Sequence, residues 1–119
     1  MAINKKKRAM VHAKYGGHCA YCGTDIILKK MEVDHRNPKF HWEPGPQQWP
    51  GSADDLDNLE PSCHFCNHYK GAYEFEQFRE NLIQLERILN ETHKIKVAKS
   101  FGIVQVSKWD GVFFFERFV

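Results

Sequence analysis

The apolar residues between positions 73 and 89 recur at the spacing of an α-helix. Phe78, Leu82, Leu85 and Leu89 follow one another at intervals of four, three and four residues. This spacing places the four side chains on one face of an amphipathic helix. The pattern therefore predicts a helix over residues 73–89 that packs through a single apolar face.

Two segments closer to the N-terminus have recognisable local signals. Residues 4–15 are predicted to form a helix, with Asn4 as its N-cap and Gly16-Gly17 at its end. Residues 26–34 contain the Ile and Val side chains that are typical of a strand. We therefore expect a helix followed by a strand in this part of the chain.

Shorter helices are predicted on either side of the long one. Ser62 is a good N-cap for a helix that runs through Lys70 and stops at Gly71. A further helix is expected to follow Asn90 and to end before Gly102.

The tail, residues 102–119, is predicted to form a β-hairpin that turns at the Trp-Asp-Gly of residues 109–111 and has a Phe-rich second strand. Residues 38–51 hold four prolines and two glycines, too many for a regular element. Two tryptophans in that segment argue against free disorder, because large rings favour burial. Together the elements predict a mixed, α+β fold.

Length and composition are those of one small globular domain, residues 1–119. Of the 119 residues, 42% are hydrophobic and 27% are charged. We expect the core of this domain at about residues 15–71 and a helical and hairpin extension over residues 72–119. Such a short chain buries only a modest core, so a structural metal would contribute much of its stability.

The net charge of +2 conceals an uneven distribution of charged residues. Residues 1–30 hold seven Lys or Arg and a single acidic residue, whereas residues 51–60 hold four acidic residues and no basic one. Basic surfaces attract the phosphates of nucleic acids. The candidates for such contacts near the N-terminus are Lys5, Lys6, Lys7 and Arg8.

No segment is predicted to enter a membrane. The longest strongly apolar run, residues 112–115, is far too short to span a bilayer, and the basic run near the N-terminus is not followed by the apolar region of a signal peptide. A cytoplasmic location is therefore expected, and there cysteines are more often metal ligands than disulfides.

All four cysteines fall into two CxxC units, Cys19-x-x-Cys22 and Cys63-x-x-Cys66, which are separated by 40 residues. Two residues between cysteines allow a tight turn to present both thiolates to one ion, and four thiolates suit tetrahedral zinc. The alternatives are four unrelated buried cysteines or a redox-active pair. The pairing favours a closed structural zinc that has no open position for chemistry.

Three further motifs lie between and beside these cysteine pairs, in a fixed order. They are Glu32-Val33-Asp34-His35, then Asp57-Asn58-Leu59, then Cys63-x-x-Cys66-Asn67-x-x-Lys70-Gly71. With the first CxxC unit, this order resembles the HNH endonuclease family in its version with a zinc-binding cysteine quartet. The resemblance covers about residues 15–71.

The resemblance implies a ββα-metal fold, in which two antiparallel strands and a helix hold one divalent ion. It implies that His35 is the general base, that Asp34 and Asn67 are ligands of the catalytic ion, and that Asn58 fixes the loop around the histidine. Since His is the more frequent residue at the position of Asn67, the chain is an H-N-N variant. Its two oxygen ligands favour Mg or Mn, with zinc or nickel as alternatives.

The chemistry of phosphodiester hydrolysis agrees with these roles. An imidazole titrates near neutral pH and is suited to taking a proton from water. A hard cation held by few protein ligands keeps positions open for the phosphate. Arg36 and Lys70 are further candidates for phosphate contacts. The acidic cluster of residues 54–57 and Glu60 are interpreted as solvated loop residues rather than as a second metal site.

The leading hypothesis is an endonuclease that hydrolyses DNA by a one-metal mechanism, as a monomer or a homodimer. The alternative is a zinc-stapled nucleic-acid-binding module without turnover. A purely structural zinc protein, which acts through protein contacts and does not bind DNA, is a third hypothesis.

Overall fold

The computed structural model describes residues 3–38 and 52–118, so the two tryptophans of the predicted loop lie outside the described residues. The chain forms two compact units. The first consists of the chain up to Phe75 together with the segment from Phe113, and the second runs from Glu76 to Val112. Helices and a two-stranded antiparallel sheet are both present, which confirms the α+β class.

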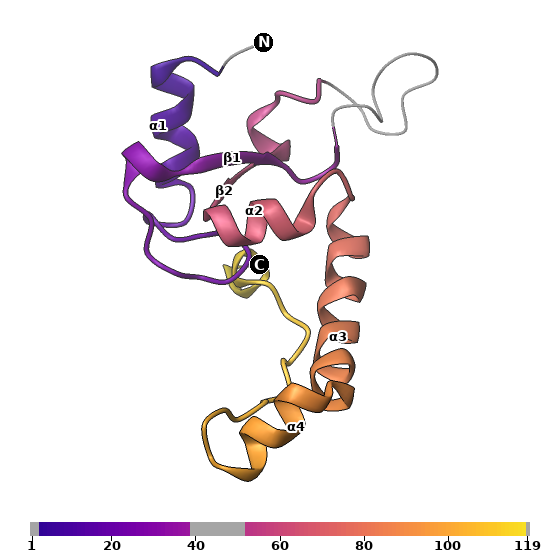
Figure 1. The fold of residues 1–119 in the computed structure, drawn as a ribbon. Helices are drawn as coiled ribbons and strands as arrows, with labels where there is room; N and C mark the ends of the chain where they lie inside the picture. Colours follow the sequence, from indigo (N-terminus) through magenta and orange to yellow (C-terminus); the bar gives the residue numbers. More distant parts are fainter. Residues whose placement is uncertain (1–2, 39–51, 119) are drawn as a thin grey trace. The chain divides into compact units, whose positions relative to one another are not determined.

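The first unit contains the predicted N-terminal helix, α1 (Lys5–Ala13) (Figure 1). Asn4 is its N-cap, as predicted, and its side chain accepts a hydrogen bond from the backbone nitrogen of Lys7 at 2.8 Å. The chain then reverses through Gly16 and Gly17, both of which have positive φ. Glycine carries no steric penalty in that conformation, which explains the end of the helix.

The sheet of the first unit pairs β1 (Glu32–His35) with β2 (Leu59–Ser62) (Figure 1). The strands are antiparallel, and Asp34 lies opposite Glu60. The strand predicted over residues 26–34 is therefore only partly present. Residues 28–30 instead form a 3₁₀ turn, because the Met31 backbone nitrogen bonds back to residues 27 and 28 rather than to a partner strand.

Directly after β2 comes α2 (His64–Lys70), which ends at Gly71 as predicted. Its N-cap is Cys63 and not Ser62, because Ser62 belongs to β2 and is paired with Glu32. The Cys63 sulfur accepts a hydrogen bond from the Cys66 backbone nitrogen at 3.4 Å. A cysteine thus caps the helix that also carries the last motif of the sequence.

The second unit contains most of α3 (Phe75–Glu91) and all of α4 (His93–Ser100). Both helices were predicted. Phe78 is buried, and Leu82, Leu85 and Leu89 are half-buried, in accord with an amphipathic helix.

The predicted C-terminal β-hairpin is wrong. Among the described residues no strand follows residue 102, and the chain ends in a 3₁₀ helix, Phe114–Phe118. The backbone nitrogens of Phe114 and Phe115 donate to the carbonyls of Tyr21 and Ala20, at 3.1 and 2.8 Å. These hydrogen bonds go to the first CxxC unit, so the Phe-rich segment needs no partner strand of its own.

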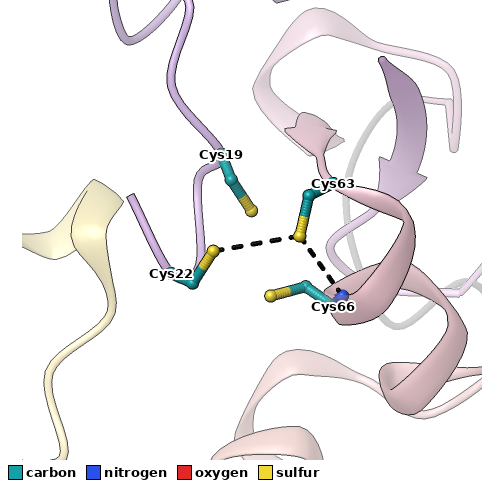
Figure 2. Close-up of side chains that lie close together, drawn as sticks. All are labelled: Cys19, Cys22, Cys63 and Cys66. Atoms are coloured by element: carbon teal, nitrogen blue, oxygen red, sulfur yellow. Dashed lines mark hydrogen bonds between the residues drawn. The ribbon is translucent and has the colours of Figure 1, made fainter. Parts of the chain in front are cut away.

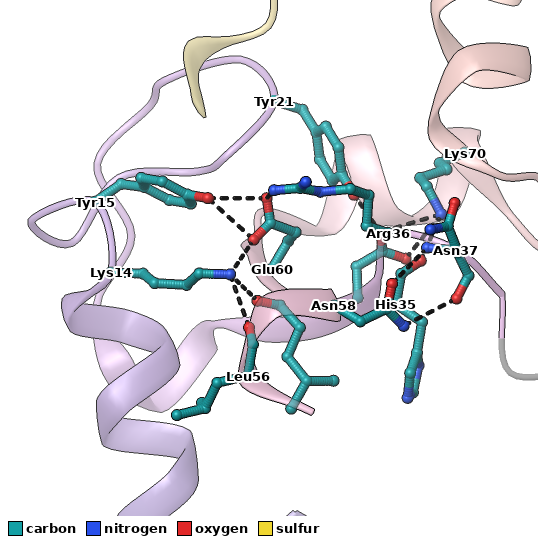
Figure 3. Close-up of polar contacts among 12 residues, drawn as sticks. Lys14, Tyr15, Tyr21, His35, Arg36, Asn37, Leu56, Asn58, Glu60 and Lys70 are labelled. Carbon is teal, nitrogen blue, oxygen red and sulfur yellow. Dashed lines mark hydrogen bonds and ion pairs between the residues drawn. The ribbon is translucent and has the colours of Figure 1, made fainter. Parts of the chain in front are cut away.

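A buried carboxylate, Glu60, joins β2 to the end of α1 (Figure 3). Lys14 Nζ lies 2.5 Å from one carboxylate oxygen, and Arg36 Nη2 lies 2.9 Å from the other. The Tyr15 hydroxyl donates to both oxygens at 3.0–3.1 Å. Two cations therefore neutralise one charge that water does not reach, which is the condition under which a buried charge is tolerated.

Replacing Glu60 with glutamine should destabilise the protein, because Lys14 and Arg36 would be left as half-buried charges without a counter-ion. We expect Glu60→Gln to lower the free energy of unfolding by about 3–5 kcal/mol, measured by urea denaturation. Glu76→Gln removes an exposed partner of Arg79 and should cost less than about 1 kcal/mol. Equal losses for the two variants would contradict a special role for Glu60.

Candidate functional site

The four cysteines converge on one point of the first unit (Figure 2). Their sulfur atoms all lie within 4.8 Å of one another, and the sulfurs of Cys22 and Cys63 are 3.8 Å apart. No disulfide links them. Among the His, Cys, Asp and Glu side chains of the described residues, these four form the group whose ligand atoms lie close enough together to hold a metal ion.

Local backbone geometry builds each half of this cluster. The first pair, Cys19 and Cys22, lies on a turn in which the Gly23 nitrogen donates to the Cys19 carbonyl at 3.0 Å. Gly23 has φ +80°, and a Cβ there would lie 2.6 Å from a ring carbon of Phe114, so any other residue would strain the backbone and displace that ring. The second pair lies at the start of α2.

The chemistry of the cluster suits a thiophilic ion. Cys19 is fully buried. Hydrogen bonds from the Cys22 and Cys66 thiols lower the pKa of Cys19, which favours the thiolate form that binds metal ions. Four convergent thiols match the number of ligands that tetrahedral zinc takes, and together they would leave no position for a substrate. The predicted structural metal site is thus assembled in the structure.

A second cluster lies where β1 faces α2, and Asp34 is at its centre. Its carboxylate is buried and lies 3.1–3.3 Å from Lys70 Nζ. The Tyr21 hydroxyl donates to the same carboxylate, and Lys70 also donates to the His35 carbonyl at 2.9 Å. Burial raises the pKa of Asp34, and the opposing effect of the Lys70 charge only partly offsets it.

Asn67 lies one helical turn before Lys70 on α2, but it has a different partner. Its amide nitrogen donates to a carboxylate oxygen of Glu32 at 2.7 Å, and His64 Nδ1 lies 2.8 Å from the other oxygen. The hydrogen bond from Asn67, together with that from His64, lowers the pKa of Glu32. The two predicted ligands of the catalytic ion therefore lie on different elements, Asp34 on β1 and Asn67 on α2. No hydrogen bond joins their side chains.

His35 ends β1, and its side chain has a partner that sequence reasoning missed. His35 Nε2 lies 2.7 Å from Asp54 Oδ1, and both side chains are mostly buried. Asp54 belongs to the acidic cluster that was interpreted as solvated. Nothing in the sequence distinguishes it from Asp55 or Asp57, because the contact depends on how the loop before β2 folds.

Asn58 has the loop-fixing geometry that its motif position implies. Its side-chain oxygen accepts a hydrogen bond from the Asn37 nitrogen at 2.9 Å. Its amide nitrogen donates to the carbonyls of Asn37 and Ala53, at 3.0 and 2.9 Å. One buried side chain therefore connects the segment after β1 to the segment before β2 (Figure 3).

Three of the six basic candidates for phosphate contact point into the fold. Arg8 donates to the carbonyls of residues 28 and 31, and Arg36 pairs with Glu60 and lies over the ring of Phe115. Lys70 is almost completely buried. The remaining candidates, on the first turn of α1, are exposed or half-buried: Lys5, Lys6 and Lys7.

Comparison with known proteins agrees with this arrangement. The sequence profile described as HNH endonuclease matches residues 19–72, which span both cysteine pairs and both clusters. This matched segment, 54 of the 119 residues, resembles the HNH endonuclease family. This chain is similar to the CRISPR-associated endonuclease Cas9 of Corynebacterium diphtheriae, with 35% identity over 63 residues. Those residues are 53% of this chain and 5% of that protein.

A solved structure also resembles this chain. The Type II-C Cas9 enzyme from Actinomyces naeslundii superposes with a TM-score of 0.49 and 21% identity, over 91% of this chain and 14% of that one. The chain thus spans a small part of the length of both relatives. Among the described residues, no helix has the length and apolar character needed to cross a membrane.

The cysteine cluster leads to a direct test of metal content. We expect the wild-type protein to bind one zinc ion per chain, and Cys63→Ser to lose both the ion and cooperative thermal unfolding, because metal binding is coupled to folding. Metal analysis and calorimetry measure the two effects. His64→Ala, a change within the same CxxC unit, should retain the zinc. Loss of zinc in that variant would make His64 a ligand.

Proposed function

We propose that this chain is a metal-dependent endonuclease that hydrolyses DNA phosphodiester bonds with His35 as general base. The proposal rests on the arrangement of two side chains at the end of β1. There a half-buried imidazole and a buried carboxylate, on consecutive residues, are each held by a partner from another segment. The match of residues 19–72 to the HNH endonuclease family supports the reaction class, and the relative named above is an endonuclease.

In the proposed reaction His35 takes a proton from a water molecule through a ring nitrogen. The water oxygen attacks phosphorus, the bond to the opposite oxygen breaks, and the leaving oxygen takes up a proton from solvent. An imidazole is suited to this step because it accepts protons near neutral pH. Asn58 supports the step indirectly, since it fixes the backbone on both sides of the site.

The catalytic ion of the proposal would be held by the Asp34 carboxylate and the Asn67 amide oxygen. A divalent ion there would stabilise negative charge on the phosphoryl oxygens. The donor set fits a hard cation, since both ligands offer oxygen. The ammonium of Lys70 against Asp34 marks this carboxylate as a position that attracts a cation. Magnesium or manganese is therefore the proposed cofactor.

The four cysteines have a separate function in this proposal. Their set is closed, so the zinc that we assign to them holds the turn of Cys19 and Cys22 against the start of α2. Since α2 carries Asn67 and Lys70, the zinc would fix the side of the site opposite β1. It takes no part in the chemistry.

One observation favours a second candidate function, a zinc-held DNA-binding module without turnover. Both oxygens of Asp34 contact protein donors, from Lys70 and Tyr21, and the Asn67 amide is paired with Glu32. If these contacts persist, no divalent ion binds at Asp34. DNA binding in a gel-shift assay, with no nicking under Mg or Mn, would support this module over the endonuclease.

The assignment of His35 as base predicts the behaviour of His35→Ala. We expect nicking of supercoiled plasmid, with added Mg or Mn, to fall about 10²- to 10⁴-fold, the usual contribution of a general base. Zinc content and thermal stability should stay close to wild type. The control is His93→Ala, an exposed histidine of α4, which should cut normally. Full activity of His35→Ala would remove His35 from this role.

The position of Lys70 predicts competition with the catalytic ion. Lys70→Met leaves the buried Asp34 without its counter-ion, so the variant should unfold at a lower temperature than wild type. Mn²⁺ should then raise its unfolding temperature more than it raises that of wild type, because the ion replaces the missing charge. The double variant Lys70→Met/Asp34→Asn should show no such gain. A gain in the double variant would place the Mn²⁺ elsewhere.

A further inference from the structure

Asp54 and His35 form a hydrogen bond that the four functional motifs do not include. The bond joins Asp54 Oδ1 to His35 Nε2 at 2.7 Å, and the two side chains are 18% and 26% exposed. A carboxylate only accepts hydrogen bonds when it is ionised, so the shared proton lies on the imidazole. Within the described residues Nδ1 of His35 has no hydrogen-bond partner. The two ring nitrogens are therefore not equivalent.

The loop that carries Asp54 is ordered by its own hydrogen bonds. The Asp54 backbone nitrogen donates to Ser52 Oγ at 3.2 Å, and the Ser52 nitrogen donates to Asp55 Oδ2 at 3.0 Å. The Asn58 side chain then donates to the carbonyl of Ala53, the residue directly before Asp54. The carboxylate thus reaches His35 from a backbone that is held on both sides.

We propose that Asp54 is the positioning residue of the general base: its carboxylate accepts the Nε2–H of His35 and so leaves Nδ1 as the nitrogen that takes the proton from water. The inference rests on the proposed endonuclease function. A hydrogen bond at one ring nitrogen fixes the tautomer and the orientation of the ring. It also stabilises the imidazolium that forms when the water is deprotonated.

With this assignment, the motif residue Asn58 can influence the orientation of the His35 ring. Asn58 itself forms no hydrogen bond with the His35 ring. It holds the Ala53 carbonyl, the next residue presents its carboxylate, and that carboxylate orients the imidazole. Asn58 therefore acts on His35 through Asp54.

The tautomer can be measured without any cleavage. In ¹⁵N spectra of the zinc-loaded wild-type protein at a pH where His35 is neutral, its signals should be those of an imidazole protonated at Nε2. The His35→Ala spectrum assigns these signals. Asp54→Ala should lose the preference. A wild-type His35 protonated at Nδ1 would overturn the proposal, whether or not the protein cuts DNA.

Cleavage provides the second measurement. Asp54→Ala should lower kcat by roughly 10- to 100-fold, the range for loss of a group that orients a functional imidazole, and should leave KM for DNA unchanged. Asp54→Asn keeps an oxygen acceptor of the same shape, so it should retain the tautomer and lose less activity. The matched control is Asp57→Asn, an exposed acid of the same segment, which should behave as wild type.

The outcomes separate this inference from the proposed function. If the wild-type protein does not cut DNA but His35 is protonated at Nε2, the endonuclease proposal fails and the positioning contact stands. If the wild-type protein cuts and Asp54→Ala cuts equally fast, the positioning role fails and the endonuclease stands. If Asp54→Ala does not fold, the comparison of Asp54→Asn with Asp57→Asn decides, and equal kcat in these two would overturn the role of Asp54.

Discussion

Two buried carboxylates lie opposite each other in the β1–β2 ladder, and most of the polar structure of the first unit follows from them. Asp34 and Glu60 are direct partners in the antiparallel register, so their side chains leave the sheet on the same face. Like charges in this position destabilise a sheet unless cations compensate them. Lys14 and Arg36 supply the cations for Glu60, and Lys70 supplies the one for Asp34.

The same constraint explains why several basic residues are inside the protein. Arg36 and Lys70 belong to the motif region, and from the sequence alone they are reasonable phosphate contacts. The ladder places acidic groups beside them, and a buried ion pair broken on one side costs several kcal/mol. Both side chains are therefore held within the fold, and among the predicted phosphate contacts Lys5 and Lys6 are the exposed ones that remain as proposed contacts.

The sequence was sufficient for features that depend on short-range chemistry. Asn4 caps α1, Gly71 ends α2, and the apolar spacing of α3 requires only neighbouring residues. The cysteine cluster was also predictable, because a CxxC turn is local and one ion needs both pairs.

Features that depend on distant partners were not predictable. The Phe-rich tail has the composition of a strand, but its backbone nitrogens bond to Ala20 and Tyr21, more than 90 residues earlier. Asp54 resembles the other acids of its loop until the fold brings it to His35.

The cysteine cluster and the proposed ion position at Asp34 differ in what balances their charge when no ion is bound. The cysteine cluster is complete within the chain, and soft thiolates hold a borderline ion firmly once the fold is formed. Asp34 is a hard, buried anion that an ammonium from the same chain already neutralises. If no lysine neutralised this buried carboxylate, the protein would lose stability whenever a bound ion dissociated. Lys70 neutralises Asp34 without any ion, so the proposed divalent ion would have to bind this carboxylate better than the lysine does.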